Sequence, residues 1–252
     1  MKKVQFYESE YPYDTLEKFG LTREMIEDLP MHVLDDLSAG LRSPVLPIKV
    51  KNDNGDEIAC RSRFSFVYSD EGKVQAVFYP ALKTAPLEKF GAEEQKSLMA
   101  GKTIVSDVNL PDGLCTRAYI QIDPETRQVI TVPASLIENN LKLASDAFHL
   151  AQQEVTSIKN GKPLTFSIGN DPITIGVDLG DHRVIRKRKG DDIEWKNQSK
   201  KEWGKYTFGC YGCWITDSDG NHDYISEEDY TEELWDEQKK AGQRNISSGL
   251  RK

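Results

Sequence analysis

The sequence predicts an α+β protein of tandem repeats, each a helix plus a small antiparallel β-sheet, with a C-terminal β-hairpin and helix module. Three glycines support this prediction, because Gly40, Gly101 and Gly161 recur about every 60 residues. Each glycine follows an amphipathic helical pattern and precedes alternating apolar and polar residues, the pattern typical of half-buried strands. The same order of elements is therefore expected three times.

The expected domain boundaries follow this repeat. Residues 1–28 form an N-terminal leader, and the repeat units cover residues 29–84, 85–134 and 135–190. Residues 191–252 form the C-terminal hairpin-helix module, and its end, from Gly242, is expected to be disordered.

The leader and the first unit contain short elements with clear end signals. Asp14 is expected to cap a short helix that stops at Gly20, and Thr22 to cap the next one. The first unit has a helix between Pro30 and Gly40, followed by strands at residues 45–50, 63–67 and 74–79.

The second and third units repeat this order. The second has a helix at 92–98 and strands at 117–122 and 128–132, with Arg117 and Pro133 expected to match Arg63 and Pro80 of the first unit. The third is expected to begin with one long helix, residues 135–158, before strands at 164–168 and 173–179.

The C-terminal module reads as a hairpin and a helix. A β-type run over residues 206–215 is followed by a turn at 217–221 and a returning strand at 224–225. Ser226 is expected to cap an acidic helix.

The composition restricts the class of protein. The chain has 252 residues, 38% of them apolar and 29% charged, and a net charge of −8. It contains no apolar run of the length that crosses a bilayer and no secretory signal, and its four cysteines are scattered, so we expect a cytoplasmic protein without a membrane partner. The negative net charge argues against a surface that is basic everywhere, although a local nucleic-acid site remains compatible with it.

Two motifs resemble ligand sites and have simpler explanations. Gly101-Lys102-Thr103 is similar to the end of a phosphate-binding loop, but here the glycine ends a helix, where carbonyls rather than amides are free. Cys210 and Cys213 have the spacing of half a zinc site, and His222 is the nearest further ligand, whereas a structural zinc needs four ligands.

A calcium loop is the other metal hypothesis. The expected ligand positions 1, 3, 5, 7 and 12 of such a loop are occupied by Asp217, Asp219, Asn221, Asp223 and Glu228. His222 takes the place of the usual glycine, and a hairpin turn followed by an acidic helix explains the same residues. We therefore predict no cofactor, and keep a small metal-binding protein centred on the two cysteines as an alternative.

A basic segment with interleaved aromatic residues is the candidate nucleic-acid site. Cations bind the phosphate backbone and aromatic rings stack on unpaired bases. The segment also has a simpler explanation, because residues 217–237 are densely acidic and could neutralise it within the fold. The predicted nucleic-acid-binding residues are Arg183, Arg186, Lys187, Arg188, Lys189, Trp195, Lys200, Lys201, Trp203 and Lys205.

The sequence from Leu16 to Gly20, continued through Asp28-Leu29-Pro30 and Leu37 to Gly40, resembles an uncharacterised family. Members of that family are encoded on conjugative and integrative elements of Bacteroidales. The later units, with Gly101-Lys102 and the strand and turn at 117–123, look similar to a second uncharacterised domain, found fused to or encoded near DNA topoisomerases. The resemblance implies accessory work around mobile DNA, and it carries over no catalytic residue.

The leading hypothesis is thus a non-enzymatic accessory or adaptor protein of a mobile genetic element. Its expected partner is nucleic acid or a DNA-processing protein such as a topoisomerase. A purely protein-binding module, docking a partner through exposed sheet edges or the acidic helix, is the alternative. The sequence contains no nucleophile elbow, no HExxH motif and no distinct pair of carboxylates.

Overall fold

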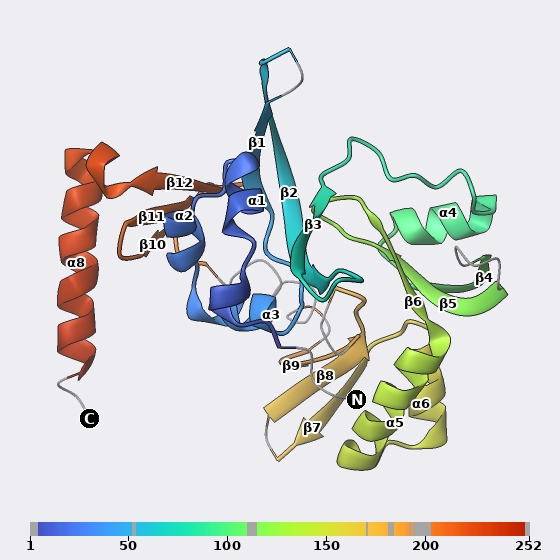
Figure 1. Cartoon of the computed structure of the whole chain (residues 1–252). Helices are drawn as coiled ribbons and strands as arrows, with labels where there is room; N and C mark the ends of the chain where they lie inside the picture. Colours follow the sequence, from blue (N-terminus) through green and yellow to red (C-terminus); the bar gives the residue numbers. More distant parts are fainter. Residues whose placement is uncertain are drawn as a thin grey trace. The chain divides into compact units, whose positions relative to one another are not determined.

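The structure is a computed structural model of the whole chain (Figure 1). It describes residues 5–51, 54–109, 115–169, 171–180, 184–191, 193 and 203–249, with side chains as far as residue 242. The α+β prediction is confirmed, because seven α-helices accompany four antiparallel three-stranded sheets in this described part. None of the described helices is long and apolar enough to cross a membrane.

The chain forms two compact units, and unit 1 is discontinuous in sequence. Unit 1 combines residues 1–80 with residues 201–252, and unit 2 contains residues 81–200. The predicted C-terminal module thus belongs to the same unit as the leader and the first repeat.

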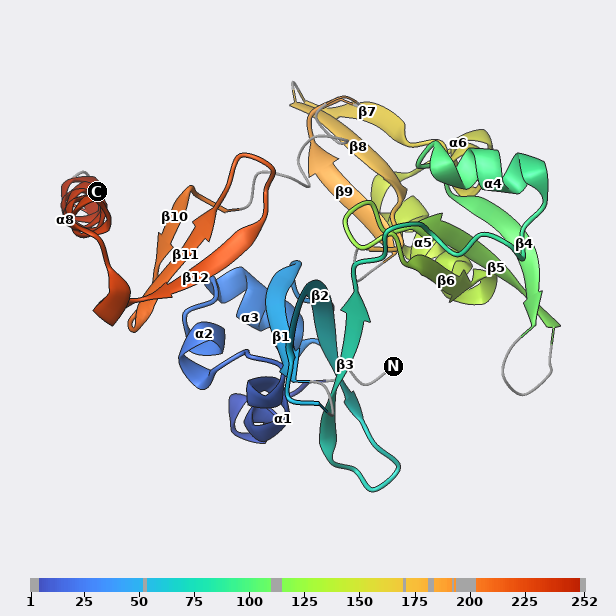
Figure 2. The ribbon, with the colours of Figure 1, turned by 90° about the horizontal axis from the view of Figure 1, so that it is seen from above.

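The described residues of unit 1 form seven elements in its N-terminal part and five in its C-terminal part. They are η1 (Glu8–Glu10), α1 (Tyr13–Lys18), α2 (Arg23–Glu27), α3 (Met31–Ser38), β1 (Leu46–Lys51), β2 (Glu57–Tyr68), β3 (Val74–Pro80), β10 (Tyr206–Phe208), β11 (Gly212–Thr216), β12 (His222–Ser226), η3 (Glu227–Asp229) and α8 (Glu232–Gly249). Figure 2 shows the two three-stranded sheets of this unit, with α2 beside the C-terminal one.

Unit 2 contains the second and third repeats. Its described elements are α4 (Ala92–Met99), β4 (Ile104–Asn109), β5 (Cys115–Ile122), β6 (Val129–Pro133), α5 (Ala134–Phe148), α6 (Gln152–Lys159), β7 (Leu164–Ile168), β8 (Asp171–Val177) and β9 (Ile185–Lys189). Two apolar clusters fill it, one around Leu98 and Ile120 and a larger one around Ile137, Leu141 and Ile158.

Each repeat places a helix of eight residues before its sheet. These helices are α3, α4 and α6, which begin at residues 31, 92 and 152. The next-to-last residue of each helix is apolar and buried: Leu37 in α3, Leu98 in α4 and Ile158 in α6. The period of about 60 residues in the sequence is therefore a period of helices that each anchor one sheet.

The same C-terminal motif ends all three helices. The glycine after each helix has a positive φ, 77° at Gly40, 72° at Gly101 and 74° at Gly161. The next residue donates its N–H to a carbonyl of the last turn, for example Lys102 N to Ser97 O at 3.0 Å. This is the Schellman motif, in which an L-residue at the glycine position would be strained. The helix-capping interpretation of Gly101 and Gly161 is confirmed.

The predicted long helix of the third unit is in fact two helices. His149 has a φ of 54° and ends α5, and Leu150 N donates to Ser145 O in another Schellman motif. α6 then begins where Ala151 N donates to a carboxylate oxygen of Glu154 at 2.7 Å, as Gly91 N does to Glu94 before α4. Apolar spacing continues across the break, so the periodicity did not reveal it.

All four sheets are meanders, and their registers relate the repeats. The strand orders are β1-β2-β3, β4-β5-β6, β7-β8-β9 and β10-β11-β12. Pro80 lies opposite Ser62, and Pro133 lies opposite Ala118, so the two prolines are equivalent as predicted. Ser62 is therefore equivalent to Ala118, and the residue before each of them is an arginine. Arg61, rather than the predicted Arg63, is thus the counterpart of Arg117.

The central strand of the first sheet extends beyond its neighbour. β3 pairs with residues 62–68 of β2 and ends at Pro80, whereas β1 pairs with residues 57–62. Among the described residues, residues 57–61 therefore have a partner strand on the β1 side alone (Figure 1, where β1 and β2 project past β3). Pro80 lacks an N–H group and ends the pairing there.

The core of unit 1 joins both ends of the chain. Phe64 and Phe66 of β2 pack with leader residues such as Leu16 and Ile26 and with Trp214 of β11, and all of these are buried. The indole Nε1 of Trp214 donates a hydrogen bond to Met25 O at 3.1 Å. The C-terminal sheet is thus part of this core.

The acidic helix begins later than predicted. Ser226 makes no side-chain capping bond, and the next element is the short helix η3. The hydroxyl of Thr231 accepts from Leu234 N at 3.3 Å and caps α8, which extends past Gly242 to Gly249, into the segment for which the sequence predicted disorder.

Candidate interaction surfaces

Aromatic side chains connect β10 to the start of α8. Ring centroids are 6.1 Å apart between Tyr206 and Phe208, 6.2 Å between Phe208 and Tyr230, and 5.1 Å between Tyr230 and Trp235. The first three rings are half-buried, and Trp235 is 37% exposed. Aromatic groups that are partly exposed and already ordered are frequent anchors of protein interfaces.

Seven carboxylates lie in η3 and the first turns of α8, the segment that also contains Tyr230 and Trp235. We call the four rings and the following carboxylates the acidic–aromatic surface: Glu227, Glu228, Asp229, Glu232, Glu233, Asp236 and Glu237. The ammonium group of Lys205 lies 4.7 Å from the centre of the Tyr206 ring. The pKa of Lys205 is raised, first by Tyr206 and then by Glu233 and Glu237. The surface also contacts two further lysines of the chain, because Lys239 pairs with Asp236 at 3.4 Å and Lys240 pairs with Glu237 at 2.7 Å.

Asp28 of the leader holds the β10–β11 turn. Its carboxylate accepts from Cys210 N at 2.6 Å, from Tyr211 N at 3.0 Å and from the hydroxyl of Tyr224 at 2.7 Å. Asp28 is 5% exposed, so these bonds offset the cost of burying its charge. Burial, followed by the bond to Asp28, raises the pKa of Tyr224.

The approach of the turn to Asp28 requires glycine. A side chain at Gly209 would overlap with the Asp28 carboxyl group, and one at Gly212 would overlap with Tyr224. The Gly-Cys-Tyr-Gly sequence is therefore a docking turn.

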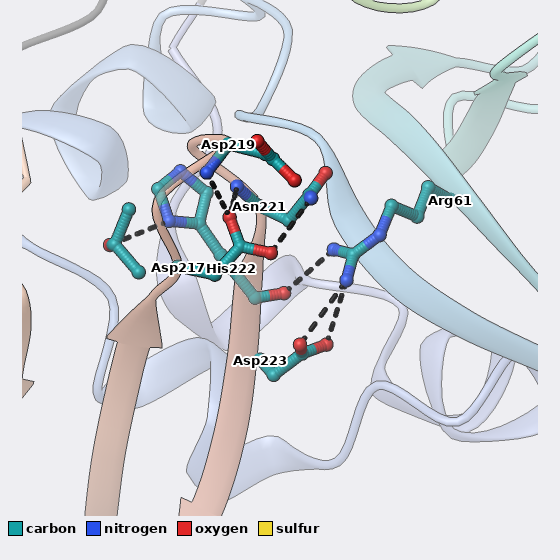
Figure 3. Close-up of polar contacts among 7 residues, drawn as sticks. Arg61, Asp217, Asp219, Asn221, His222 and Asp223 are labelled. Atoms are coloured by element: carbon teal, nitrogen blue, oxygen red, sulfur yellow. Dashed lines mark hydrogen bonds and ion pairs between the residues drawn. The ribbon is translucent and has the colours of Figure 1, made fainter.

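The β11–β12 turn is organised by Asp217 (Figure 3). Its carboxylate accepts from Asp219 N and Asn221 N, both at 2.8 Å, and from the side-chain amide of Asn221 at 2.9 Å. These bonds lower the pKa of Asp217, with Asn221 contributing most. The arrangement is the Asx-type turn expected of a hairpin.

Arg61 of β2 binds the neighbouring strand β12. It donates to His222 O at 2.9 Å and to the carboxylate of Asp223 at 3.1 and 3.2 Å (Figure 3). Asp223 is thus paired with an arginine, and Glu228 lies apart from the turn, in η3. The five residues proposed for calcium are divided between these separate contacts.

His222 is a buried member of the same strand. Its ring stacks on Trp203 at 4.1 Å, and its Nδ1 lies 3.0 Å from the hydroxyl of Thr216. Burial lowers its pKa to about 4, and the charge of Arg61 adds to this effect. The imidazole is therefore neutral at physiological pH.

The two cysteines differ in their surroundings. Cys210 is exposed in the docking turn, whereas Cys213 is buried in β11, and burial raises the pKa of the Cys213 thiol to about 11. A raised pKa disfavours the thiolate that zinc and redox chemistry use. Within the described ranges, no group of three or more His, Cys, Asp or Glu side chains could hold a metal ion.

The predicted basic segment is divided between the two units. Arg186, Lys187, Arg188 and Lys189 lie in β9, whereas Trp203 and Lys205 precede β10. Arg183, Trp195, Lys200 and Lys201 lie outside the described residues.

Several of the described cations already have intramolecular contacts. The guanidinium of Arg186 is buried and lies 3.0 Å from the carboxylate of Asp178. The ammonium of Lys187 lies 4.8 Å from the centre of the Phe148 ring, and that of Lys189 lies 3.5 Å from Asp171. Lys187 and Lys189 are nevertheless exposed.

Sequence reasoning missed Asp28 and Arg61. Each contacts a residue more than a hundred positions away, and no local pattern marks such a pairing. The one available signal was the pair of glycines at 209 and 212, which flank the docking turn.

Comparison with known protein families gives a match to the N-terminal part of the chain. Residues 6–89, about a third of the chain, match a family described as "Protein of unknown function (DUF4099)". No curated protein and no solved structure matches the chain. The matched residues contain most of the leader, including Asp28, and the first sheet, so this part of the chain is similar to an uncharacterised domain family.

Proposed function

We propose that this protein is a non-enzymatic accessory or adaptor protein of a mobile genetic element. It binds a DNA-processing protein, such as a topoisomerase, through the acidic–aromatic surface. The mobile-element setting rests on the sequence resemblance, and the mode of binding rests on that surface.

The observation that supports this function most directly is the position of Lys205. Its ammonium lies over the ring of Tyr206 and is attracted by Glu233 and Glu237. Proteins that act on DNA carry Lys- and Arg-rich surfaces. A cation from such a partner would find a similar combination of a ring face and carboxylates at the start of α8, where Glu232, Glu233 and Trp235 are exposed.

The test is binding of a purified topoisomerase from such an element to the immobilised full chain. The variant Glu232→Gln, Glu233→Gln, Asp236→Asn is expected to bind at least tenfold more weakly, with a smaller salt dependence, because three exposed carboxylates are lost. The matched control is Asp70→Asn with Glu71→Gln, which removes charge from the β2–β3 turn of the same unit. Equal loss in both variants would contradict a specific role of α8.

Nucleic-acid binding is the second candidate, favoured by the exposed cations of β9. Labelled single- and double-stranded DNA at two salt concentrations would test it, with the variant Lys187→Ser, Arg188→Ser, Lys189→Ser. Arg186 is kept in this variant, because removing it would leave the carboxylate of Asp178 without its buried partner. Salt-sensitive binding that the variant loses would favour DNA over protein as the partner.

A further inference from the structure

The open edge of β2 has the features of a surface that pairs with another strand. Residues 57–61 have a strand partner on the β1 side alone within the described part of the chain. Proteins usually protect such an edge with charges or a covering segment. Here the middle of the edge is Ile58-Ala59-Cys60, and Ile58 is 53% exposed.

The five residues of this edge are complementary to themselves. If two copies pair antiparallel about Ala59, Ile58 lies opposite Cys60 of the second copy, and Glu57 lies opposite Arg61 of the second copy. The charged pairs are of opposite sign, and the apolar pairs lie on one face, the combination that stabilises cross-strand neighbours. Alanine at the twofold axis faces alanine, which leaves room for close pairing.

The neighbouring strand extends this complementarity. Val50 lies opposite Ile58 and Ile48 lies opposite Cys60, so all four side chains are on the same face of the hairpin. In the dimer, two rows of four apolar side chains would therefore cross the joined sheet. One row contains Val50 and Ile58 of one copy with Cys60 and Ile48 of the second copy, and the other row is its symmetry mate. On the other face, the carboxylate of Glu57 lies 3.5 Å from the ammonium of Lys49, so it would lie between this lysine and Arg61 of the second copy.

Arg61 can bind Glu57 of the second copy while it keeps its present contacts with β12. It binds His222 and Asp223 through its Nη1 and Nη2 atoms. A guanidinium has five N–H donors and can hold two carboxylates at once.

We propose that this edge is a homodimerisation surface, in which residues 57–61 of two copies pair antiparallel and join their first sheets into one. The contact is isologous, with the same segment used by both copies. The edge shares no residue with the acidic–aromatic surface.

Cysteine cross-linking tests the register. In a background with Cys60, Cys115 and Cys210 changed to Ser, Ala59→Cys places two thiols directly opposite each other, within the Cα separation that a disulfide spans. We expect a covalent dimer on mild oxidation. Lys49→Cys is the matched control, because it is exposed on the same face but lies one strand further from the axis on each side. Equal cross-linking at both positions would overturn the register.

Sedimentation equilibrium of the full chain tests the association itself. We expect a concentration-dependent dimer that Glu57→Arg weakens about tenfold, because two attractive pairs become repulsive. Ile58→Lys should abolish it, whereas Val77→Lys, another exposed apolar position of the same sheet, should not. Circular dichroism would verify that these variants fold. A wild-type chain that stays monomeric up to about 0.5 mM, or a dimer unaffected by Ile58→Lys, refutes the proposal and leaves the edge to a different partner or to none.

Discussion

Replacing Asp28 by Ala should loosen the C-terminal module from the leader. The carboxylate accepts three hydrogen bonds from Cys210, Tyr211 and Tyr224, and each bond to a charged group contributes about 1.5–3 kcal/mol. Cys210 and Tyr211 are exposed residues, so water can reach part of the turn, and the sum is smaller than three full bonds. We expect a loss of about 3 kcal/mol in the free energy of unfolding of unit 1. Asp28→Asn should cost about half as much.

Urea unfolding followed by tryptophan fluorescence measures this loss. Trp203, Trp214 and Trp235 all belong to unit 1, so the signal is weighted towards that unit. With a slope of about 2 kcal/mol per molar urea, the midpoint should fall by about 1.5 M. The control Asp70→Ala, in an exposed turn, should change the free energy by less than about 0.5 kcal/mol. A midpoint for Asp28→Ala within that control range would refute the docking role of this carboxylate.

Three further predictions concern other positions in the two units. The pKa of His222 is about 4 in the folded chain and about 6.5 in the unfolded chain, so protonation favours unfolding. Between pH 7.5 and pH 4.5, the free energy of unfolding of unit 1 should therefore fall by about 2.5 kcal/mol. Urea denaturation of His222→Gln at the two pH values should not show this fall. Gly101→Ala should cost about 1 kcal/mol in thermal unfolding from its positive φ. Gly161→Ala should cost clearly more, because its Cβ would lie 2.9 Å from Thr103 O, and equal shifts would contradict this. Arg186→Met should destabilise unit 2 by about 2 kcal/mol in urea, and a neutral result would show that its buried ion pair contributes little.

Local signals in the sequence predicted the helix ends and most strands of the repeats, whereas β4 and β9 were not predicted. The glycines at 40, 101 and 161 mark helix ends because their positive φ is a requirement of the backbone itself. Alternating residues predicted strands, and Pro80 and Pro133 marked their ends because proline cannot continue a ladder. Such signals depend on neighbours in the chain and need no knowledge of the tertiary fold.

Tertiary pairings were beyond the reach of these signals. The basic segment looked continuous, but Arg186 is buried against Asp178, and Trp203 stacks on His222 in the other unit. Likewise, no residue near Asp28 in the sequence indicates that its carboxylate binds a turn near residue 210. Sequence spacing shows which residues share a face, and it does not show which distant surface covers that face.

The discontinuity of unit 1 determines the order in which the chain can fold during synthesis. The ribosome delivers all of unit 2 before it delivers Trp214, which completes the core of unit 1. The leader and the first sheet must therefore wait, with Phe64 and Ile26 incompletely covered, while unit 2 is already able to fold. During this interval they are exposed to chaperones and proteases. A premature stop codon after residue 200 would consequently leave the first eighty residues without part of their core and destabilise them, whereas unit 2 would be complete.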